Sequence, residues 1–183
     1  MWTERLLEAT GWTDQRLKLS WDDVESALEL ELPDDYKRLC AAFGPGEFCG
    51  AYALTSVGDG SWADTLISWQ VELRCAPEPG SEDERHSVYA PHAIYRPGTT
   101  GLIPWGYGTS DQKLFWLADS GSPNDWPTLA LWSDELGAEW NRFDMTASEF
   151  IGRAVLDPDF GDFGFADLIP RPFFLPPRDE EAA

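Results

Sequence analysis

Hydrophobic and polar positions in the N-terminal part of the chain follow the period of amphipathic helices. Residues 1–12 predict a short helix that is anchored by Leu6 and Leu7 and ended by Gly11. In residues 20–44, apolar side chains recur every three or four positions on both sides of a Leu-Pro pair. This spacing predicts two helices joined at that pair.

Local signals indicate where these two helices begin and end. Ser20 is the expected cap of the first helix, with Asp23 reaching back to complete a capping box. Pro33 suits the first turn of the second helix, because its missing N–H would be unpaired there in any case. Gly44 supplies the expected stop. The predicted apolar face of the second helix is Leu32, Tyr36, Leu39 and Phe43.

The rest of the chain is dominated by strand-like patterns. Residues 61–74 predict one more helix, whereas the polar and acidic residues 76–87 are expected to form an exposed loop. Thr146 begins a final helix, with Glu149 at the capping-box position. Strands are expected at residues 47–56, with a bend at Gly50, and at 102–103, 114–117, 128–132 and 140–143.

Consecutive strands joined by turns predict an α+β fold, in which an antiparallel sheet packs against several helices. A chain of 183 residues is long enough for one sizeable core. We therefore expect a single domain over residues 1–156. Residues 157–183 are rich in acids, proline and phenylalanine, and the prolines at 170, 172, 176 and 177 are expected to exclude regular structure. This segment is expected to form a C-terminal extension that docks on the domain and ends in a disordered tail.

Three groups of residues resemble the SUKH superfamily, which is named in part after a yeast regulator of cell-wall synthesis. The first group is an acidic helix followed by L-P-x-D-Y-K and a final F-G. The others are residues 102–116, LIPWGYGTSDQKLFW, and residues 143–150. The matching positions of the first group are Trp21, Val24, Glu25, Leu28, Leu32, Pro33, Asp35, Tyr36, Lys37, Phe43 and Gly44.

The resemblance implies a SUKH-like fold and a function class. In bacteria this family consists largely of immunity proteins that neutralise polymorphic toxins, and its eukaryotic namesake is a regulatory protein. The family resemblance extends from about residue 20 to residue 155 and leaves the C-terminal extension outside.

Charge narrows the set of partners. The chain carries 33 acids against 13 Lys and Arg residues, a formal net charge of −20. Such a field excludes direct binding to nucleic acid or to an anionic membrane and favours a basic protein partner. An acidic surface that serves only solubility explains the same charge. Residues 121–183 are the most acidic third, with 13 acids and four bases.

Several features bear on where the protein acts. No apolar run approaches the length of a membrane span, and the N-terminus lacks the apolar core of a signal peptide. The three cysteines, Cys40, Cys49 and Cys75, are widely spaced and odd in number, which fits a reducing compartment. We therefore expect a cytoplasmic protein.

The candidate contact residues are carboxylates interleaved with aromatic rings. The spacing of the acids after residue 156 fails the EF-hand pattern, so a solvated acidic surface or a partner-binding patch is favoured over a calcium site. Basic partner groups would meet the carboxylates while the rings supply desolvated anchors. The predicted partner-binding residues are Asp157, Asp159, Phe160, Asp162 and Phe163, with Asp111 in the preceding hairpin.

Other motifs have simpler interpretations than catalysis or cofactor binding. Residues 105–112 are predicted as a long hairpin turn in which Gly106 and Gly108 tolerate positive φ. Their sequence lacks the last glycine and the lysine of phosphate loops. The only histidines, His86 and His92, have no neighbour at metal-ligand spacing.

Glu25 and Asp35 are each explained as first-turn helix acids. No catalytic residue, metal or cofactor is assigned from the sequence.

We therefore expect a non-enzymatic immunity protein that binds a cognate, basic toxin domain through its acidic surface. A nuclease is one candidate toxin, because an acidic protein can occupy a nucleic-acid groove as a phosphate mimic. The alternative is a regulatory or scaffold module that binds host proteins, with the Pro-rich tail as its docking segment.

Overall fold

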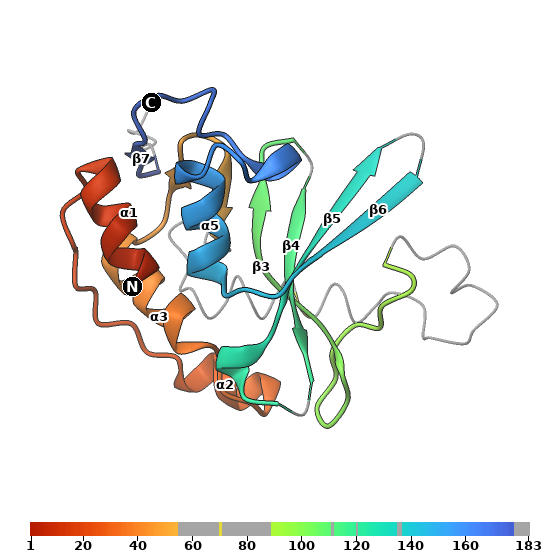
Figure 1. Ribbon diagram of the computed structural model, residues 1–183. Coiled ribbons are helices and arrows are strands. Elements are labelled where there is room, and N and C mark those ends of the chain that lie inside the picture. Colours follow the sequence, from red (N-terminus) through yellow and green to blue (C-terminus); the bar gives the residue numbers. More distant parts are fainter. Residues whose placement is uncertain (55–69, 71–88, 111, 120, 135–136, 178–183) are drawn as a thin grey trace, which may run out of the picture.

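The structure, a computed structural model, describes residues 1–54, 70, 89–110, 112–119, 121–134 and 137–177 (Figure 1). Its helices are α1 (Trp2–Thr10), α2 (Asp22–Leu28), α3 (Asp34–Phe43) and α5 (Ala147–Leu156), with short 3-10 helices η2 (Pro123–Asp125) and η3 (Gly161–Phe163). Its strands are β1 (Glu47–Phe48), β2 (Tyr52–Leu54), β3 (Gly101–Gly108), β4 (Lys113–Ala118), β5 (Thr128–Asp134), β6 (Gly137–Phe143) and β7 (Phe174–Leu175).

The seven strands form one antiparallel sheet in the order β6-β5-β4-β3-β2-β1-β7. Among the described residues, the edges of the sheet are therefore β6 and β7. Helices α1, α3 and α5 contact one another and lie against one face, while β5 and β6 extend away from them (Figure 1). The predicted α+β class with an antiparallel sheet is confirmed.

The main hydrophobic core lies between the helices and the sheet. Side chains of β3 alternate between the two faces, so Ile103 and Trp105 join the helices in this core while Leu102 points to the other face. A second, smaller cluster on that other face consists of Leu102, Phe115, Leu129 and Leu131, with Tyr89 and Ile94 packed against it.

The helical periodicities of α1, α3 and α5 are confirmed. All four predicted residues of the α3 face are buried, and Gly44 follows the helix with a φ of 72°. Gly11 ends α1 in the left-handed conformation. At the start of α5, Thr146 Oγ1 accepts a hydrogen bond of 3.3 Å from the Glu149 N–H.

Helix starts were predicted less well. Trp21, and not Ser20, stands at the N-cap of α2, which has no side-chain cap. Pro33 occupies the N-cap of α3 in an extended conformation and lies one residue before the first turn. At α5, the Glu149 carboxylate binds Arg153 at 2.8 Å.

The predicted strand over residues 47–56 is instead a hairpin of β1 and β2. Cys49 and Gly50 have φ values of 57° and 63° and reverse the chain between them. A Cys in this conformation is unfavourable, so the sequence carried only the glycine as a signal.

The predicted long turn over residues 105–112 is also corrected, because β3 continues through Gly108. Neither Gly106 nor Gly108 has a positive φ. A Cβ on Gly106 would lie 2.8 Å from the Ala53 carbonyl oxygen, and a Cβ on Gly108 would lie 2.3 Å from Gln112 Oε1. Gly106 is required for the close approach of the neighbouring backbone, whereas a side chain at position 108 would displace the end of the Gln112 side chain.

Residues 157–177 lie against the domain. The Phe165 N–H donates to the Ala154 carbonyl at 2.6 Å, and β7 pairs with β1. The prolines around residue 174 were expected to exclude regular structure. They instead flank a two-residue strand at the sheet edge, where proline is tolerated.

Some predictions fall outside the described residues: the helix over 61–74 apart from Gln70, the loop over 76–87, the disordered tail from 178, and the positions of Cys75, His86 and Asp111. No helix in the described part of the chain is long and apolar enough to cross a membrane.

Candidate partner-binding surfaces

The predicted contact patch lies in the turn that follows α5. Asp157 ends the helix, because its N–H donates to the Arg153 carbonyl at 2.8 Å. Its carboxylate lies 3.6 Å from Arg153 Nη1 and also accepts the Asp159 N–H at 3.0 Å. Asp157 therefore shapes the turn, and its role as a partner contact stays a prediction.

The two aromatic residues of the patch point inward. Phe163 is only 5% exposed and packs against Phe143 and Phe150, with ring centroids 5.2 and 6.1 Å away. Phe160 is half-buried, and its ring centroid lies 5.5 Å from that of Phe143 and 5.4 Å from that of Phe150. The ring of Phe163 completes the hydrophobic core, and its role as a partner anchor stays a prediction.

Asp159 and Asp162 are the exposed part of the predicted patch. Neither takes part in an ion pair with another described residue. The sixth predicted contact, Asp111, lies outside the described residues.

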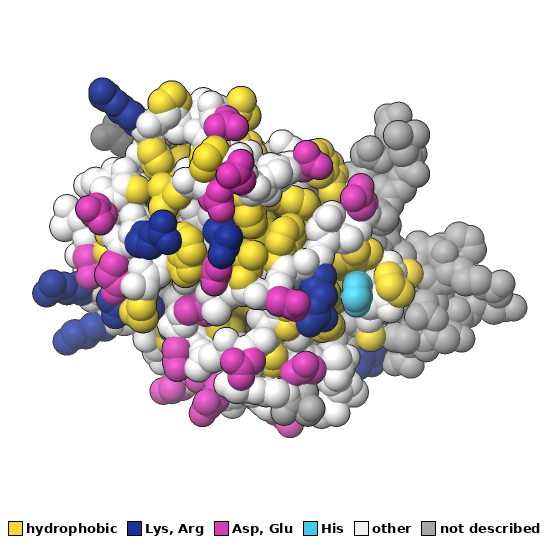
Figure 2. All heavy atoms as spheres, viewed as in Figure 1, with side chains coloured by type: hydrophobic (Ala, Val, Ile, Leu, Met, Phe, Trp, Pro, Cys, Tyr) yellow, Lys and Arg dark blue, Asp and Glu magenta, His cyan; other side chains and the backbone are white. Residues whose placement is uncertain are grey.

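Trp132 on β5 belongs to the same surface and was missed from the sequence. Its ring lies 6.3 Å from the ring of Phe163 and is 37% exposed, and the exposed Glu139 is its cross-strand partner on β6. Figure 2 shows hydrophobic side chains at the surface between α5 and the β5–β6 pair. The sequence could have indicated this position, because the alternation of residues 128–132 places Trp132 on the same face of the strand as Thr128 and Ala130.

A second acidic surface runs from α2 to the start of α3. Residues 22–35 contain seven acids and no Lys or Arg. Figure 2 shows the carboxylate side chains gathered along the lower edge of the molecule, over α2. The sequence analysis used these acids for the family resemblance and for helix dipoles, and it did not identify them as a surface.

Two of the seven acids hold the fold together. Glu25 Oε1 accepts the Leu32 N–H at 2.8 Å and pairs with Lys37, which ties the end of the α2–α3 connection to both helices. Asp35 Oδ2 accepts the Ser148 N–H at 2.9 Å, at the start of α5. Both residues also lie in the first turns of their helices, as the sequence predicted.

The remaining acids of this segment are exposed. Asp34 exchanges two hydrogen bonds with Asn124 of η2, at 2.7 and 3.1 Å. This contact joins η2, and with it the exposed Asp125, to the same surface. The acids that take part in no ion pair within the described part of the chain are Asp22, Asp23, Glu29 and Glu31.

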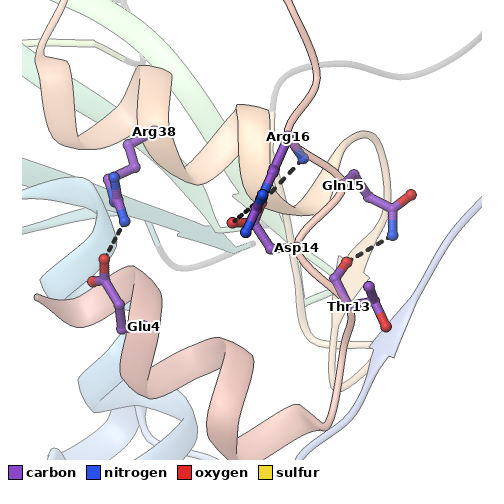
Figure 3. Close-up of polar contacts among 6 residues, drawn as sticks. All are labelled: Glu4, Thr13, Asp14, Gln15, Arg16 and Arg38. Carbon is purple, nitrogen blue, oxygen red and sulfur yellow. Dashed lines mark hydrogen bonds and ion pairs between the residues drawn. The ribbon is translucent and has the colours of Figure 1, made fainter.

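The two arginines closest in sequence to this acidic segment are engaged elsewhere. Arg38 on α3 pairs with Glu4 of α1, and Arg16 contacts Asp14 through both its backbone N–H and its guanidinium group (Figure 3). Gln15 closes the same loop by donating to the Thr13 carbonyl at 2.7 Å (Figure 3). These contacts leave the acids of residues 22–34 without neutralisation by the arginines closest in sequence.

The thiols of Cys40 and Cys49 and the imidazole of His92 are partly or fully buried, and burial shifts the pKa of each toward its uncharged form. Burial raises the pKa of the Cys40 thiol well above its ordinary value and also raises that of Cys49. A raised pKa keeps both thiols protonated and weakly nucleophilic. His92 packs against Trp140 with ring centroids 4.8 Å apart, and burial, together with nearby Arg142, lowers its pKa. No group of three metal-ligating side chains is found among the described residues.

Comparison of the chain with protein-family models, with curated proteins and with solved structures found no match.

Proposed function

We propose that this chain is a non-enzymatic immunity protein with a SUKH-like fold, which binds and neutralises a basic toxin domain. The resemblance of residues 20–155 to the SUKH superfamily supports the function class. The observation that carries the binding mode is the acidic surface from α2 to η2, where four exposed carboxylates take part in no ion pair within the described part of the chain: Asp22, Asp23, Glu29 and Glu31. The proposed location for the protein is the cytoplasm.

The charge arrangement suits inhibition by occupation of a groove. A toxin that acts on nucleic acid has a basic cleft, and a row of exposed carboxylates can take the places of phosphates. Long-range attraction between opposite charges accelerates the encounter and contributes most at low salt. Inhibition is then stoichiometric, with one chain blocking one toxin domain.

The residues that carry the resemblance have scaffold roles. Val24, Leu28, Leu32, Tyr36 and Phe43 are all buried. Glu25 and Lys37 pair across the helix junction. In this proposal the matched positions build the platform, and partner specificity depends on the exposed acids around it.

The test is affinity capture of the tagged chain with proteins of its native host, at low and at high salt, with identification by mass spectrometry. We expect one basic, toxin-like partner in stoichiometric amount that high salt displaces. A broad set of weakly bound host proteins, or a partner whose affinity is unchanged by salt, would contradict the proposal. The broad set would favour the regulatory alternative.

A pair of matched variants locates the surface. Glu29→Gln with Glu31→Gln removes two charges from the α2–α3 surface, and Asp159→Asn with Asp162→Asn removes two from the turn after α5. Net charge changes equally in both, so a non-specific charge effect weakens binding equally. We expect the first pair of substitutions to weaken toxin binding roughly tenfold more than the second, because the first removes close charge pairs between the chain and the toxin. Equal effects would contradict the assignment of the α2–α3 surface.

A further inference from the structure

We propose that the outer edge of β6, which pairs with no other strand among the described residues, binds an extended, basic segment of the partner protein as an added strand of the sheet. This inference rests on the proposed function for the charge of the partner, and it adds how the partner attaches. It starts from the difference between the two edges of the sheet.

The edge at β7 is poorly suited to pairing with another strand. It consists of only two residues, Phe174 and Leu175, and it lies between Pro172 and Pro176. Proline lacks the backbone N–H that a ladder needs, and short strands with proline are a common way to block a sheet edge.

The edge at β6 is seven residues long and contains no proline. Its register with β5 pairs Asp134 with Gly137 and Thr128 with Phe143. Because only two residues separate Asp134 from Gly137, that pair exchanges both hydrogen bonds, and the bonded pairs then alternate along the ladder. The backbone groups of Ala138, Trp140 and Arg142 therefore face away from β5.

Side chains around this edge favour a basic strand. On the helix-facing side, Glu139 is exposed beside the exposed ring of Trp132. The turn with Asp159 and Asp162 covers the same strands, because Phe160 and Phe163 of that turn pack on Phe143 of β6. Arg142, the one base of β6, is paired with Asp144 at 2.8 Å.

A second copy of the chain is the wrong occupant on electrostatic grounds. Each copy has a formal net charge of −20, so two copies repel at close range. A partner strand with Lys or Arg at alternate positions places its cations beside Glu139, where contacts with the carboxylate are available.

The test uses the full chain and a synthetic nine-residue peptide in which Arg and Val alternate, with the Glu–Val peptide of the same length as a control. Amide hydrogen exchange is followed by NMR. We expect the Arg–Val peptide to slow exchange at Ala138, Trp140 and Arg142. The N–H groups of Glu139, Asn141 and Phe143, already bonded to β5, change little.

Two variants separate strand addition from simple charge attraction. Arg142→Pro removes an outward N–H, whereas Arg142→Ala removes the same charge and keeps that N–H. We expect Arg142→Pro to weaken peptide binding roughly tenfold relative to Arg142→Ala, which is the size of the loss when a bonded strand position is blocked. The unfolding midpoint of each variant in urea shows whether the fold is retained.

Binding without protection of the three outward amides, no binding, or equal binding by the Glu–Val peptide would overturn the proposal. Strand addition and the immunity function can each fail without the other. A captured toxin that leaves β6 amides exchanging freely supports immunity and contradicts strand addition. A peptide that protects β6 in a protein with no toxin partner supports the edge and contradicts immunity.

Discussion

The carboxylate of Asp35 accepts a hydrogen bond from the backbone N–H of Ser148, at 2.9 Å and 113 positions further along the chain. Asp35 lies in the first turn of α3, and Ser148 lies in the first turn of α5. Together with Thr146, which accepts the Glu149 N–H, Asp35 satisfies two of the orphan N–H groups at the start of α5. An acid in the first turn of one helix thus fixes the start of another.

Replacing Asp35 with Ala should therefore destabilise the fold by about 1–2 kcal/mol, the usual cost of losing a helix cap. Urea unfolding followed by tryptophan fluorescence measures this. Glu31→Gln, at an exposed acid outside the helices, is the control and should change the free energy of unfolding by less than about 0.5 kcal/mol. Equal losses in both variants would contradict a capping role for Asp35.

Gly152 of α5 is buried under Trp2 of α1. A Cβ at this position would lie 2.4 Å from Trp2 Cε3, and the Trp2 ring is also contacted by the guanidinium of Arg5, 4.0 Å from the ring centroid. We expect Gly152→Ala to destabilise the protein in spite of the higher helix propensity of alanine. In a Trp2→Ala background the clash is absent, so the same change should stabilise by up to about 1 kcal/mol. A double-mutant cycle in thermal or urea unfolding tests the reversal of sign.

Predictions from the sequence succeeded where one local pattern decided the outcome. The apolar face of α3 and the cap of α5 follow from residue spacing alone. Ser20 failed as a cap because several residues near a helix start can serve, and backbone geometry selects one of them. Gly106 and Gly108 were misread because a glycine required by a close neighbouring strand looks the same in sequence as one required by a turn.

The candidate surfaces were predicted only in part, for a physical reason. Exposure of a carboxylate such as Asp159 follows from its charge, whereas the burial of Phe163 depends on rings from β6 and α5 that are distant in sequence. The exposed Trp132 is the converse case: the end of its strand extends beyond the cover of the helices. The surface that the acids of α2 form with η2 depends on the contact between Asp34 and Asn124, which spans 90 positions.

Phe174 links the C-terminal extension to the core. It is 6% exposed, and its ring centroid lies 4.9–5.0 Å from those of Trp12, Phe43 and Phe48. Phe174→Ala should cost about 3–5 kcal/mol, as for other large-to-small changes in a core. The neighbouring Phe173 is 38% exposed, so Phe173→Ala should cost much less. Similar urea midpoints for the two variants would show that the extension does not stabilise the domain.

The same packing affects the design of deletion experiments. A chain ending before Asp157 lacks Phe160, Phe163 and Phe174, which belong to or pack against the main core. We expect such a chain to lose its cooperative unfolding transition. Loss of partner binding on deletion would then report unfolding, so the role of the turn is better tested with the substitutions of Asp159 and Asp162.

Burial of Tyr52 makes the stability of the fold depend on pH in the alkaline range. Its hydroxyl donates to the Phe163 carbonyl at 3.0 Å, and burial raises its pKa above the ordinary value of 10.0. A phenol with a raised pKa in the folded state is protonated more tightly there than in the unfolded chain. Its contribution to stability is therefore complete below pH 10 and is lost as the pH rises further.

Tyr52→Phe should be less stable than the parent at pH 7 by about 1 kcal/mol, because the Phe163 carbonyl loses its partner. Above pH 10 the parent loses stability as Tyr52 ionises on unfolding, and the variant has no such group at this position. The two curves of unfolding free energy against pH should therefore converge between pH 10 and 11. The raised pKa values of Cys40 and Cys49 also lower the stability above about pH 9. They do so equally in the parent and the variant, so they cancel in the difference between the two unfolding free energies. A constant gap across this range would show that the hydroxyl titrates alike in the folded and unfolded chains.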